Sequence, residues 1–136
     1  MDLLVKRSDG IEILRAKDLH EKAAIESLQW FVRDRVLNIL LELRREGFDP
    51  CCNEGLRSLE RQKQLVAGGT SWTLNSLHLK GKAADIVDAK LLWGASKAFW
   101  SAVGSAARHQ GMLWGGTWKG KKRDVAHVEW RGGRIA

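Results

Sequence analysis

The sequence has little of several features that place a chain in a familiar structural class. It contains only two cysteines, Cys51 and Cys52, and a disulfide between neighbouring residues requires a strained geometry. The sequence therefore has neither the disulfide framework of small secreted domains nor the cysteine spacing of a metal site. We expect both cysteines to be buried thiols on a strand.

Long apolar segments are also missing. No apolar run reaches the roughly 20 residues that a transmembrane helix needs, so we expect no stable membrane insertion. Residues 1–7 lack the apolar core and the cleavage site of a signal peptide. We therefore expect a chain that is made in the cytoplasm. Because no repeat, linker or low-complexity segment interrupts it, we also expect a single domain over residues 1–136.

Basic residues outnumber acidic ones. Lys and Arg total 23, Asp and Glu total 16, and the net charge is +7. This balance favours a polyanionic partner, such as nucleic acid, an anionic membrane surface or an anionic cell-wall polymer, without choosing among them. The densest basic run, at 119–123, has no helix-turn-helix, zinc-finger or stacking motif beside it, so we expect no nucleic-acid partner.

Hydrophobic periodicity predicts an α+β fold, with a small antiparallel sheet and flanking helices. Apolar residues recur every three or four positions over 18–46, which predicts one or two core-facing helices, with Asp18 and Glu21 as a capping box. Other helices are predicted at 58–67 and 93–110, and strands at 48–57, 78–88 (with a turn), 112–114 and 125–130. Residues 11–14 could form a short strand or a turn, and residues 70–75 a polar loop.

The sequence contains seven tryptophans. Three fall in predicted helices and are expected in the core: Trp30, Trp93 and Trp100. The other four lie in predicted loops and strands, where they could line a peptide or sugar groove or pack in the core: Trp72, Trp114, Trp118 and Trp130.

The clearest chemical signal lies in residues 76–85. His78 and Asp85 are good ligands for a divalent metal, but their separation excludes the simplest geometries. On one flat strand the two side chains would point to opposite faces, and on a helix they would lie two turns, roughly 10 Å, apart. A shared ion therefore requires a bend, which Gly81 can supply, and a third ligand from elsewhere.

The third ligand has few candidates, because the chain has four histidines. His20 opens a predicted helix and His109 closes one, and we expect both at the surface. His127 lies in an apolar predicted strand, three residues after Asp124. A histidine on a strand is more often structural than a ligand, but an Asp-x-x-His arrangement near the C-terminus, combined with the first pair, favours a metal site.

In this order the residues resemble the zinc D-alanyl-D-alanine carboxypeptidase and L-alanyl-D-glutamate endopeptidase (VanY-like) family, in particular its phage endolysin branch. The shared patterns are Gly-x-Arg-Ser at 55–58, Ser-x-His-x-x-Gly-x-Ala-x-Asp at 76–85, Trp-Gly-Gly at 114–116 and Asp/Glu-x-x-His at 124–127. Thr117, Ala126 and Val128 depart from the family pattern, where Asp, Pro and an aromatic residue are usual. These departures affect the frame and the substrate wall rather than the ligand positions.

The resemblance implies a hedgehog/DD-peptidase-like fold and a Zn²⁺ site formed by His78, Asp85 and His127. Two histidines and one aspartate leave a tetrahedral zinc ion one open position, as in catalytic sites. By resemblance, Asp124 transfers the proton in catalysis, and Glu129 is the local alternative because it points to the same side of the strand as His127.

Two further residues acquire roles by resemblance. Arg57 is implied to steady the substrate carbonyl or its developing oxyanion, and the alternative is a surface salt bridge. Ser76 is implied to orient His78 or to contact substrate, and the alternative is a simple cap or turn. Gln62, five residues after the arginine, could be a polar residue at the edge of the core.

The function implied by the resemblance is hydrolysis of peptidoglycan stem peptides by a monomeric zinc metallopeptidase. The endolysin branch suggests an L-alanyl-D-glutamate endopeptidase that reaches the bacterial cell wall from the host cytoplasm after holin-type release. Two alternatives remain: a D-alanyl-D-alanine carboxypeptidase, and a non-catalytic domain in which zinc only holds the fold. The presence of Asp124 and of an open metal position favours an enzyme.

Overall fold

The computed structural model describes residues 2–7, 9–71, 73 and 76–132. Its central feature is an antiparallel sheet with strands in the order β3 (Pro50–Glu54), β4 (Ala83–Asp88), β6 (His127–Glu129) and β5 (Leu113–Trp114). Four α-helices lie in the described part of the chain: α1 (Leu19–Glu26), α2 (Trp30–Arg45), α3 (Leu59–Ala67) and α4 (Lys97–His109). The α+β prediction, with its small antiparallel sheet and flanking helices, is confirmed.

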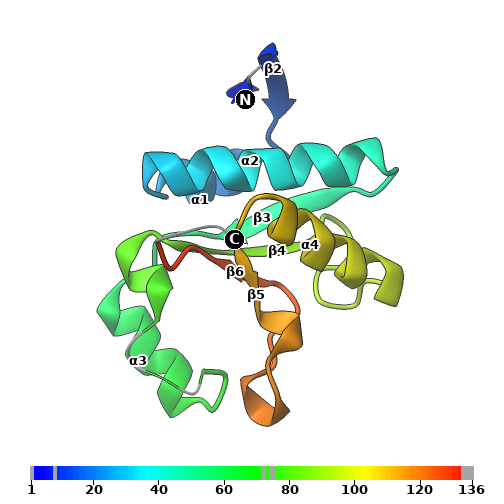
Figure 1. Ribbon diagram of the computed structural model, residues 1–136. Coiled ribbons are helices and arrows are strands. Elements are labelled where there is room, and N and C mark those ends of the chain that lie inside the picture. The colour runs from blue at the N-terminus through cyan, green and yellow to red at the C-terminus, as the bar shows by residue number, and fades with distance from the viewer. Residues whose placement is uncertain (1, 8, 72, 74–75, 133–136) are drawn as a thin grey trace.

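The elements are arranged in layers (Figure 1). A hairpin of β1 (Asp2–Arg7) and β2 (Gly10–Arg15) lies beyond α2, on the side away from the sheet. Helices α1 and α2 cover one side of the sheet, and α4 packs against α2 and β5. On the other side of the sheet are α3 and short 3₁₀ turns.

One face of the sheet belongs to the main hydrophobic core. Ala84 and Ile86 of β4 and Val128 of β6 are fully buried there, together with apolar residues of α2 and α4. Because side chains on a strand alternate between faces, Asp85 and His127 point to the opposite face. The fold therefore uses one face of β4 and β6 for packing and leaves the other for chemistry.

Several predictions from the sequence are confirmed. Residues 18–46 form two helices, and the side chain of Asp18 caps α1 by accepting a hydrogen bond from the backbone of Glu21. The reciprocal half of the capping box is absent from the described contacts, because the buried Glu21 carboxylate accepts from the backbone N–H groups of Lys17 and Cys52 instead. Cys51 and Cys52 are buried free thiols on β3.

The N-terminal hairpin was not predicted. Leu3 and Val5 face the core, but Leu4 between them is 62% exposed, and on β2 both Ile11 and Ile13 are more than 60% exposed. Apolar residues on the outer face hide the alternation by which a half-buried strand is recognised. Residues 11–14 are therefore part of a strand, and its partner β1 was missed.

Other boundaries differ from those predicted. His78 does not lie on a strand: Ser76 caps a 3₁₀ turn, η1 (Leu77–Lys80), which ends at Gly81. Strand β3 is shorter than the predicted 48–57, and β6 shorter than 125–130. Helix α4 begins at Lys97 rather than at 93, because the chain first forms a turn in which Leu92 pairs with Asp88.

The tryptophan predictions were partly wrong. Trp30, the first residue of α2, is 68% exposed, and Trp93, in the turn before α4, is 50% exposed. Trp100 packs against the core as predicted. Trp72 and part of the predicted 70–75 loop lie outside the described residues. Within the part that is described, no helix is both long and apolar enough to cross a membrane.

Candidate metal centre

Strand register brings two of the predicted ligands together. Strands β4 and β6 run antiparallel, and Asp85 of β4 lies directly opposite His127 of β6. Side chains in such a pair leave the same face with Cβ atoms roughly 5 Å apart. His127 Nδ1 consequently lies 3.7 Å from Asp85 Oδ1.

The third residue, His78, reaches the same point from η1. Gly81 ends this turn with a left-handed φ of 67°, which reverses the chain into β4 and lets His78 approach Asp85. His78 Nε2 lies 3.2 Å from Asp85 Oδ1. The bend predicted at Gly81 is therefore present, and His78, Asp85 and His127 each direct one donor atom into a region in which all three atoms lie within 4.8 Å of one another.

This geometry fits a zinc ion. Two ligand atoms at about 2.0–2.1 Å from a tetrahedral zinc lie roughly 3.3 Å apart, close to the separations of 3.2 and 3.7 Å found here. His78 Nε2 and Asp85 Oδ1 are buried and have no hydrogen-bond partner among the described residues. Since buried polar atoms are normally satisfied, this pair of unsatisfied atoms is suited to hold a cation between them.

A second layer of hydrogen bonds orients both rings. His78 Nδ1 donates to the carbonyl oxygen of Gly55 at 2.8 Å, which leaves Nε2 to face Asp85. His127 Nε2 donates to Glu129 Oε1 at 2.7 Å, which leaves Nδ1 to face Asp85. Metal-binding histidines typically make such bonds, because they fix the tautomer and the ring orientation.

The charges of the cluster are strongly coupled. Burial alone would lower the pKa of His127, but the neighbouring carboxylates of Asp85 and Glu129 outweigh this effect and raise that pKa to about 9. Burial would raise the pKa of Asp85, but His78 and His127 hold it far below its usual range. The pKa of Glu129 is also lowered, because His127 and Arg131 together outweigh its burial.

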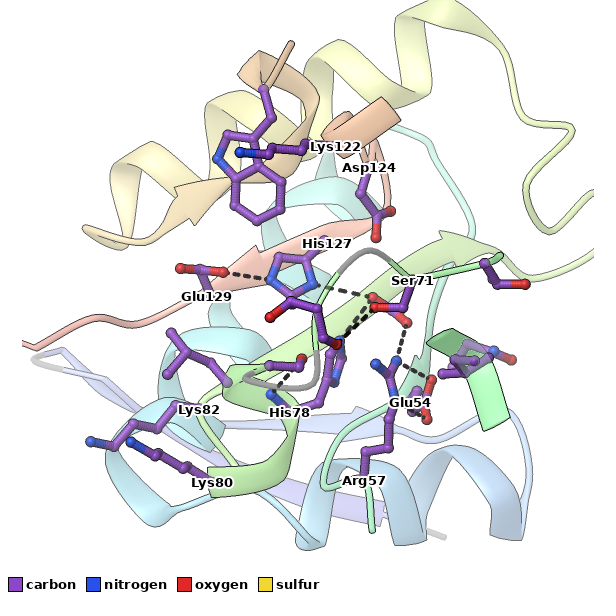
Figure 2. A pocket seen from close by; sticks show the side chains of 18 of the residues that line it. Glu54, Arg57, Ser71, His78, Lys80, Lys82, Lys122, Asp124, His127 and Glu129 are labelled. Carbon is purple, nitrogen blue, oxygen red and sulfur yellow. Dashed lines mark hydrogen bonds and ion pairs between the residues drawn. The ribbon is translucent and has the colours of Figure 1, made fainter. Parts of the chain in front are cut away.

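Asp124 enters the site through the turn before β6. Its backbone N–H donates to the carbonyl oxygen of Gly115 at 3.0 Å, and its carbonyl accepts from His127 N at 3.2 Å. Figure 2 shows its carboxylate pointing into the space beside the His127 ring. Burial and the negative charge of Asp85 raise the pKa of Asp124. The site thus contains one acidic group that holds protons more tightly than usual.

Arg57 lies in the wall of the site, with its side chain only 9% exposed. Its Nε and Nη2 donate to the Glu54 carboxylate at 2.8 and 2.7 Å, and its Nη1 donates to Gln62 Oε1 at 2.7 Å. Nη2 also lies 3.6 Å from Asp85 Oδ2. Three of the five guanidinium N–H groups are therefore used in hydrogen bonds, and the salt bridge with Glu54 is not on the surface.

The other motif residues form the frame around these groups. Ser76 caps η1 by accepting a hydrogen bond from His78 N at 3.2 Å. Gly55 approaches α1 so closely that a Cβ there would lie 2.2 Å from the carbonyl oxygen of Ala24. A Cβ on Gly116 would overlap the Trp114 ring, whose Nε1 donates to Val125 O at 2.7 Å. The glycine motifs are therefore required by close packing around the site.

Two residues acquire positions that the sequence did not reveal. Gln62 is fully buried and joins Arg57 to Ser71, to which its Nε2 donates at 2.8 Å. Glu129, considered as an alternative to Asp124, is occupied as the hydrogen-bond partner of His127. The departures Ala126 and Val128 lie in buried clusters, so they belong to the frame. His20 and His109 are exposed, as predicted.

The three candidate ligands, Asp124, Arg57 and Ser76 all line one cleft of about 770 Å³ between the sheet, α3 and the 119–123 segment (Figure 2). Trp118 and Trp130 line it as predicted, and Trp118 also contacts the His127 ring at a centroid separation of 5.1 Å. Trp93, expected in the core, lines the cleft instead, whereas Trp114 does not line it. A ligand of peptide size can therefore lie in the cleft beside His78, Asp85 and His127.

Comparisons with known proteins agree with this geometry. The sequence profile of the phage L-alanyl-D-glutamate peptidase family matches residues 26–132, which include every residue of the site. The L-alanyl-D-glutamate peptidase of Listeria phage A118 is 37% identical over 78 residues, which are 54% of this chain. That match spans 28% of the length of the Listeria phage protein.

Solved structures show the same fold. The Serratia marcescens L-Ala D-Glu endopeptidase ChiX is 32% identical, with a TM-score of 0.60 over 82% of this chain and 86% of ChiX. The vancomycin-resistance D,D-pentapeptidase VanY from the VanB-type cassette, solved in complex with Zn(II), has a TM-score of 0.58 at 15% identity, over 96% of this chain and 79% of VanY.

Proposed function

Because the chain belongs to the phage L-alanyl-D-glutamate peptidase family, we propose that it is a zinc-dependent endopeptidase that cuts the L-alanyl–D-glutamate bond of peptidoglycan stem peptides. One observation carries the proposal: His78, Asp85 and His127 direct three donor atoms into an open cleft that also contains Asp124. The relatives named above, from Listeria phage A118 and Serratia marcescens, are described as peptidases of this bond.

We assign the metal ligands to His78 Nε2, Asp85 Oδ1 and His127 Nδ1. Three protein ligands would leave a tetrahedral zinc ion one open position, as in catalytic sites. Zinc would supply Lewis-acid chemistry there, by making water a usable nucleophile at neutral pH and by polarising the scissile carbonyl. Gly55 and Glu129 hold the two imidazole rings in the orientation that this requires.

Asp124 is the proposed general base and acid. As a carboxylate it accepts the proton that the attacking water loses, and as a carboxylic acid it returns that proton to the amine that leaves with the D-glutamate residue. Its raised pKa supports this role, because a base must hold the proton long enough to deliver it. Glu129 is less suited, since His127 and Arg131 hold its two oxygens.

Arg57 and Ser76 have supporting roles in the proposal. Arg57 lies beside Asp85 and holds it in place by charge, and the N–H groups not bonded to Glu54 or Gln62 remain for the substrate carbonyl. Ser76 positions His78 by capping η1. Both residues also line the cleft, where substrate contact is open to them.

The setting of the activity is part of the proposal. Residues 1–136 would act as one monomeric peptidase domain on the bacterial cell wall, after holin-type release from the host cytoplasm. The net charge of +7 supports this setting, because a basic protein is attracted to an anionic cell envelope.

The test is digestion of purified peptidoglycan by the zinc-loaded protein, followed by mass analysis of the released fragments. We expect new N-termini on D-glutamate. Release of free D-alanine instead would identify a D-alanyl-D-alanine carboxypeptidase. If the folded, zinc-loaded protein releases nothing, the domain is not a peptidase of this substrate.

The role of Asp124 is tested by Asp124→Asn. This variant should retain one zinc per chain and lose activity by about 10²- to 10⁴-fold, because the amide cannot exchange the proton. Asp49→Asn is the matched control, since Asp49 is exposed and does not line the cleft, and it should keep full activity. Activity retained in Asp124→Asn would transfer the role to another group, with Glu129 first.

A further inference from the structure

Three aromatic side chains, which we call the aromatic strip, form a continuous row from the cleft to the surface. Trp130 lines the cleft, and its ring centroid lies 6.2 Å from that of Phe31. The Phe31 centroid lies 5.7 Å from that of Trp30, the first residue of α2, which is 68% exposed. The Arg35 guanidinium lies over the Trp130 ring, 4.1 Å from its centroid, and holds that ring in one orientation. The proposed mechanism uses none of the three aromatic residues.

Hydrogen bonds fix the strip to the bend between the first two metal ligands. The backbone N–H of Trp130 donates to Lys82 O at 2.8 Å. The backbone N–H of Gln29, the residue before Trp30, donates to Gly81 O at 3.1 Å. The strip therefore has a defined position relative to the metal centre, and such preorganisation lowers the entropic cost of binding a ligand.

The outer end of the strip adds little to the core, because Trp30 is largely exposed. Single exposed apolar residues are common on protein surfaces, but the Trp30 indole continues a row of rings that begins in the cleft. In Figure 1 the chain beyond β6 runs toward the first turn of α2, where this row reaches the surface. An exposed apolar patch that is continuous with a cleft is typical of a surface that contacts a ligand.

The proposed general base determines the direction in which a substrate lies. Asp124 returns a proton to the leaving amine, so the amine half of the substrate lies on its side of the metal centre. Asp124 precedes β6, whereas Glu129 ends this strand and Trp130 follows it. Figure 2 shows Asp124 and Glu129 on opposite sides of the His127 ring. The acyl half of the substrate is therefore directed toward Trp130 and the aromatic strip.

The acyl half of the proposed substrate carries a sugar close to the bond that is cut. In peptidoglycan the nitrogen of L-alanine is joined to the lactyl group of N-acetylmuramic acid, so a single residue separates the sugar from the scissile carbonyl. The sugar ring begins within roughly 8 Å of that carbonyl. Trp130 lies three residues after His127, which is roughly 10 Å along an extended chain. The first ring of the strip is thus at a distance that the sugar can reach.

We propose that Trp30, Phe31 and Trp130 form a sugar-binding subsite for the disaccharide of N-acetylglucosamine and N-acetylmuramic acid to which the stem peptide is attached. The inference rests on the proposed function. The C–H groups on one face of a pyranose ring pack well against the electron-rich face of an aromatic ring. The disaccharide is neutral once its lactyl group is amidated by L-alanine, so a subsite without charge suits it. The protein would then prefer stem peptides that are still attached to the glycan strand.

The test compares two substrates with the same stem peptide, L-alanyl-γ-D-glutamyl-L-lysyl-D-alanine. One carries the disaccharide on the L-alanine nitrogen, and the other carries an acetyl group there. The zinc-loaded wild-type protein should cleave the disaccharide substrate with a kcat/KM about 5- to 20-fold higher, the usual effect of one aromatic contact and the area it buries. The difference should lie in KM rather than in kcat, because the sugar is bound equally before and during the reaction.

Trp30 is the residue to replace, because its exposed side chain can be removed without leaving a cavity. Trp30→Ala should reduce the ratio between the two substrates at least threefold, and Trp30→Phe should keep most of the ratio because a ring remains. Leu19→Ala is the matched control. Leu19 is the first residue of α1, 73% exposed and outside the cleft, so this variant should keep the wild-type ratio.

Nuclear magnetic resonance of the indole N–H groups gives a readout that does not depend on turnover. The disaccharide that carries only L-alanine, which is the acyl-side product of the proposed cut, should shift the Trp30 signal of the zinc-loaded protein. Trp30→Phe identifies that signal by its loss. Trp93 also lines the cleft, but it follows the end of β4 that lies on the Asp124 side, so its signal should stay in place.

The outcomes separate the two proposals. Cleavage of both substrates by wild-type protein at equal efficiency overturns the sugar subsite and leaves the peptidase intact. A ratio that survives in Trp30→Ala, or a shift of the Trp93 signal in place of the Trp30 signal, also overturns the subsite. If a folded, zinc-loaded protein cleaves neither substrate, the proposed function fails and the subsite fails with it.

Discussion

In the metal-free protein, His127 should remain protonated at neutral pH. Its ring lies between two carboxylates, with Nδ1 3.7 Å from Asp85 and Nε2 2.7 Å from Glu129, and it is only 6% exposed. These neighbours raise its pKa from 6.5 to about 9. At pH 7 a group with that pKa is about 99% protonated, whereas an unperturbed histidine is about 25% protonated.

Two consequences follow for metal binding and for stability. Zinc must displace the proton on Nδ1, so binding at pH 7 should release about one proton from this ring instead of about a quarter. Since the folded pKa is raised, the stabilisation of about 3 kcal/mol is fully present below pH 6.5. It is lost from the metal-free protein as the pH rises through about 9.

The assay is nuclear magnetic resonance of the imidazole groups in the metal-free protein between pH 5 and 10. The variant His127→Gln identifies the signal by its loss. Glu129→Gln should lower the measured pKa of His127, because one of its two anionic partners becomes neutral. Glu26→Gln removes an exposed carboxylate on α1 and should leave that pKa in place. A His127 pKa below 7 in the metal-free wild-type protein would refute the reasoning.

Two further predictions concern the frame. Gly115→Ala should destabilise the fold by about 1–3 kcal/mol in urea denaturation, because its Cβ would lie 2.5 Å from the carbonyl oxygen of Asp124. The control Gly68→Ala, where the nearest atom is 3.4 Å away, should cost well under 1 kcal/mol. Equal losses of stability in the two variants would contradict the packing argument. Glu21→Ala should lower the free energy of unfolding by about 3 kcal/mol, because two backbone N–H groups lose a carboxylate acceptor. The control Glu26→Ala, on the same helix, removes only an exposed ion pair worth under about 0.5 kcal/mol. Similar losses of stability in the two variants would contradict a structural role for Glu21.

The convergence of His78 and Asp85 was predictable because it follows from short-range chemistry. His78 and Asp85 could share an ion only through a bend, and Gly81 was the residue able to make one. The pairing of Asp85 with His127 depends on strand register, which the spacing within each motif does not reveal. The family resemblance, and not periodicity, connected these two segments.

The parts that were missed depend on tertiary contacts. Gly55 supplies a carbonyl to His78, but a backbone carbonyl has no signature in the sequence. Trp93 carries the same apolar side chain whether it lines a cleft or fills a core, so its exposure follows from the turn before α4. The exposed leucine and isoleucines of the hairpin hid a strand, because apolar residues occupy both of its faces.

The opposition of Asp85 and His127 across β4 and β6 has a consequence for the order of events during folding. The three donor residues are separated by up to 49 positions in the chain, and His127 joins the other two only when β6 has paired with β4. A chain in which β6 has not yet paired with β4 offers an ion two ligands. Zinc uptake would therefore report the pairing of β6 with β4, and the proposed hydrolytic capacity would appear together with that pairing.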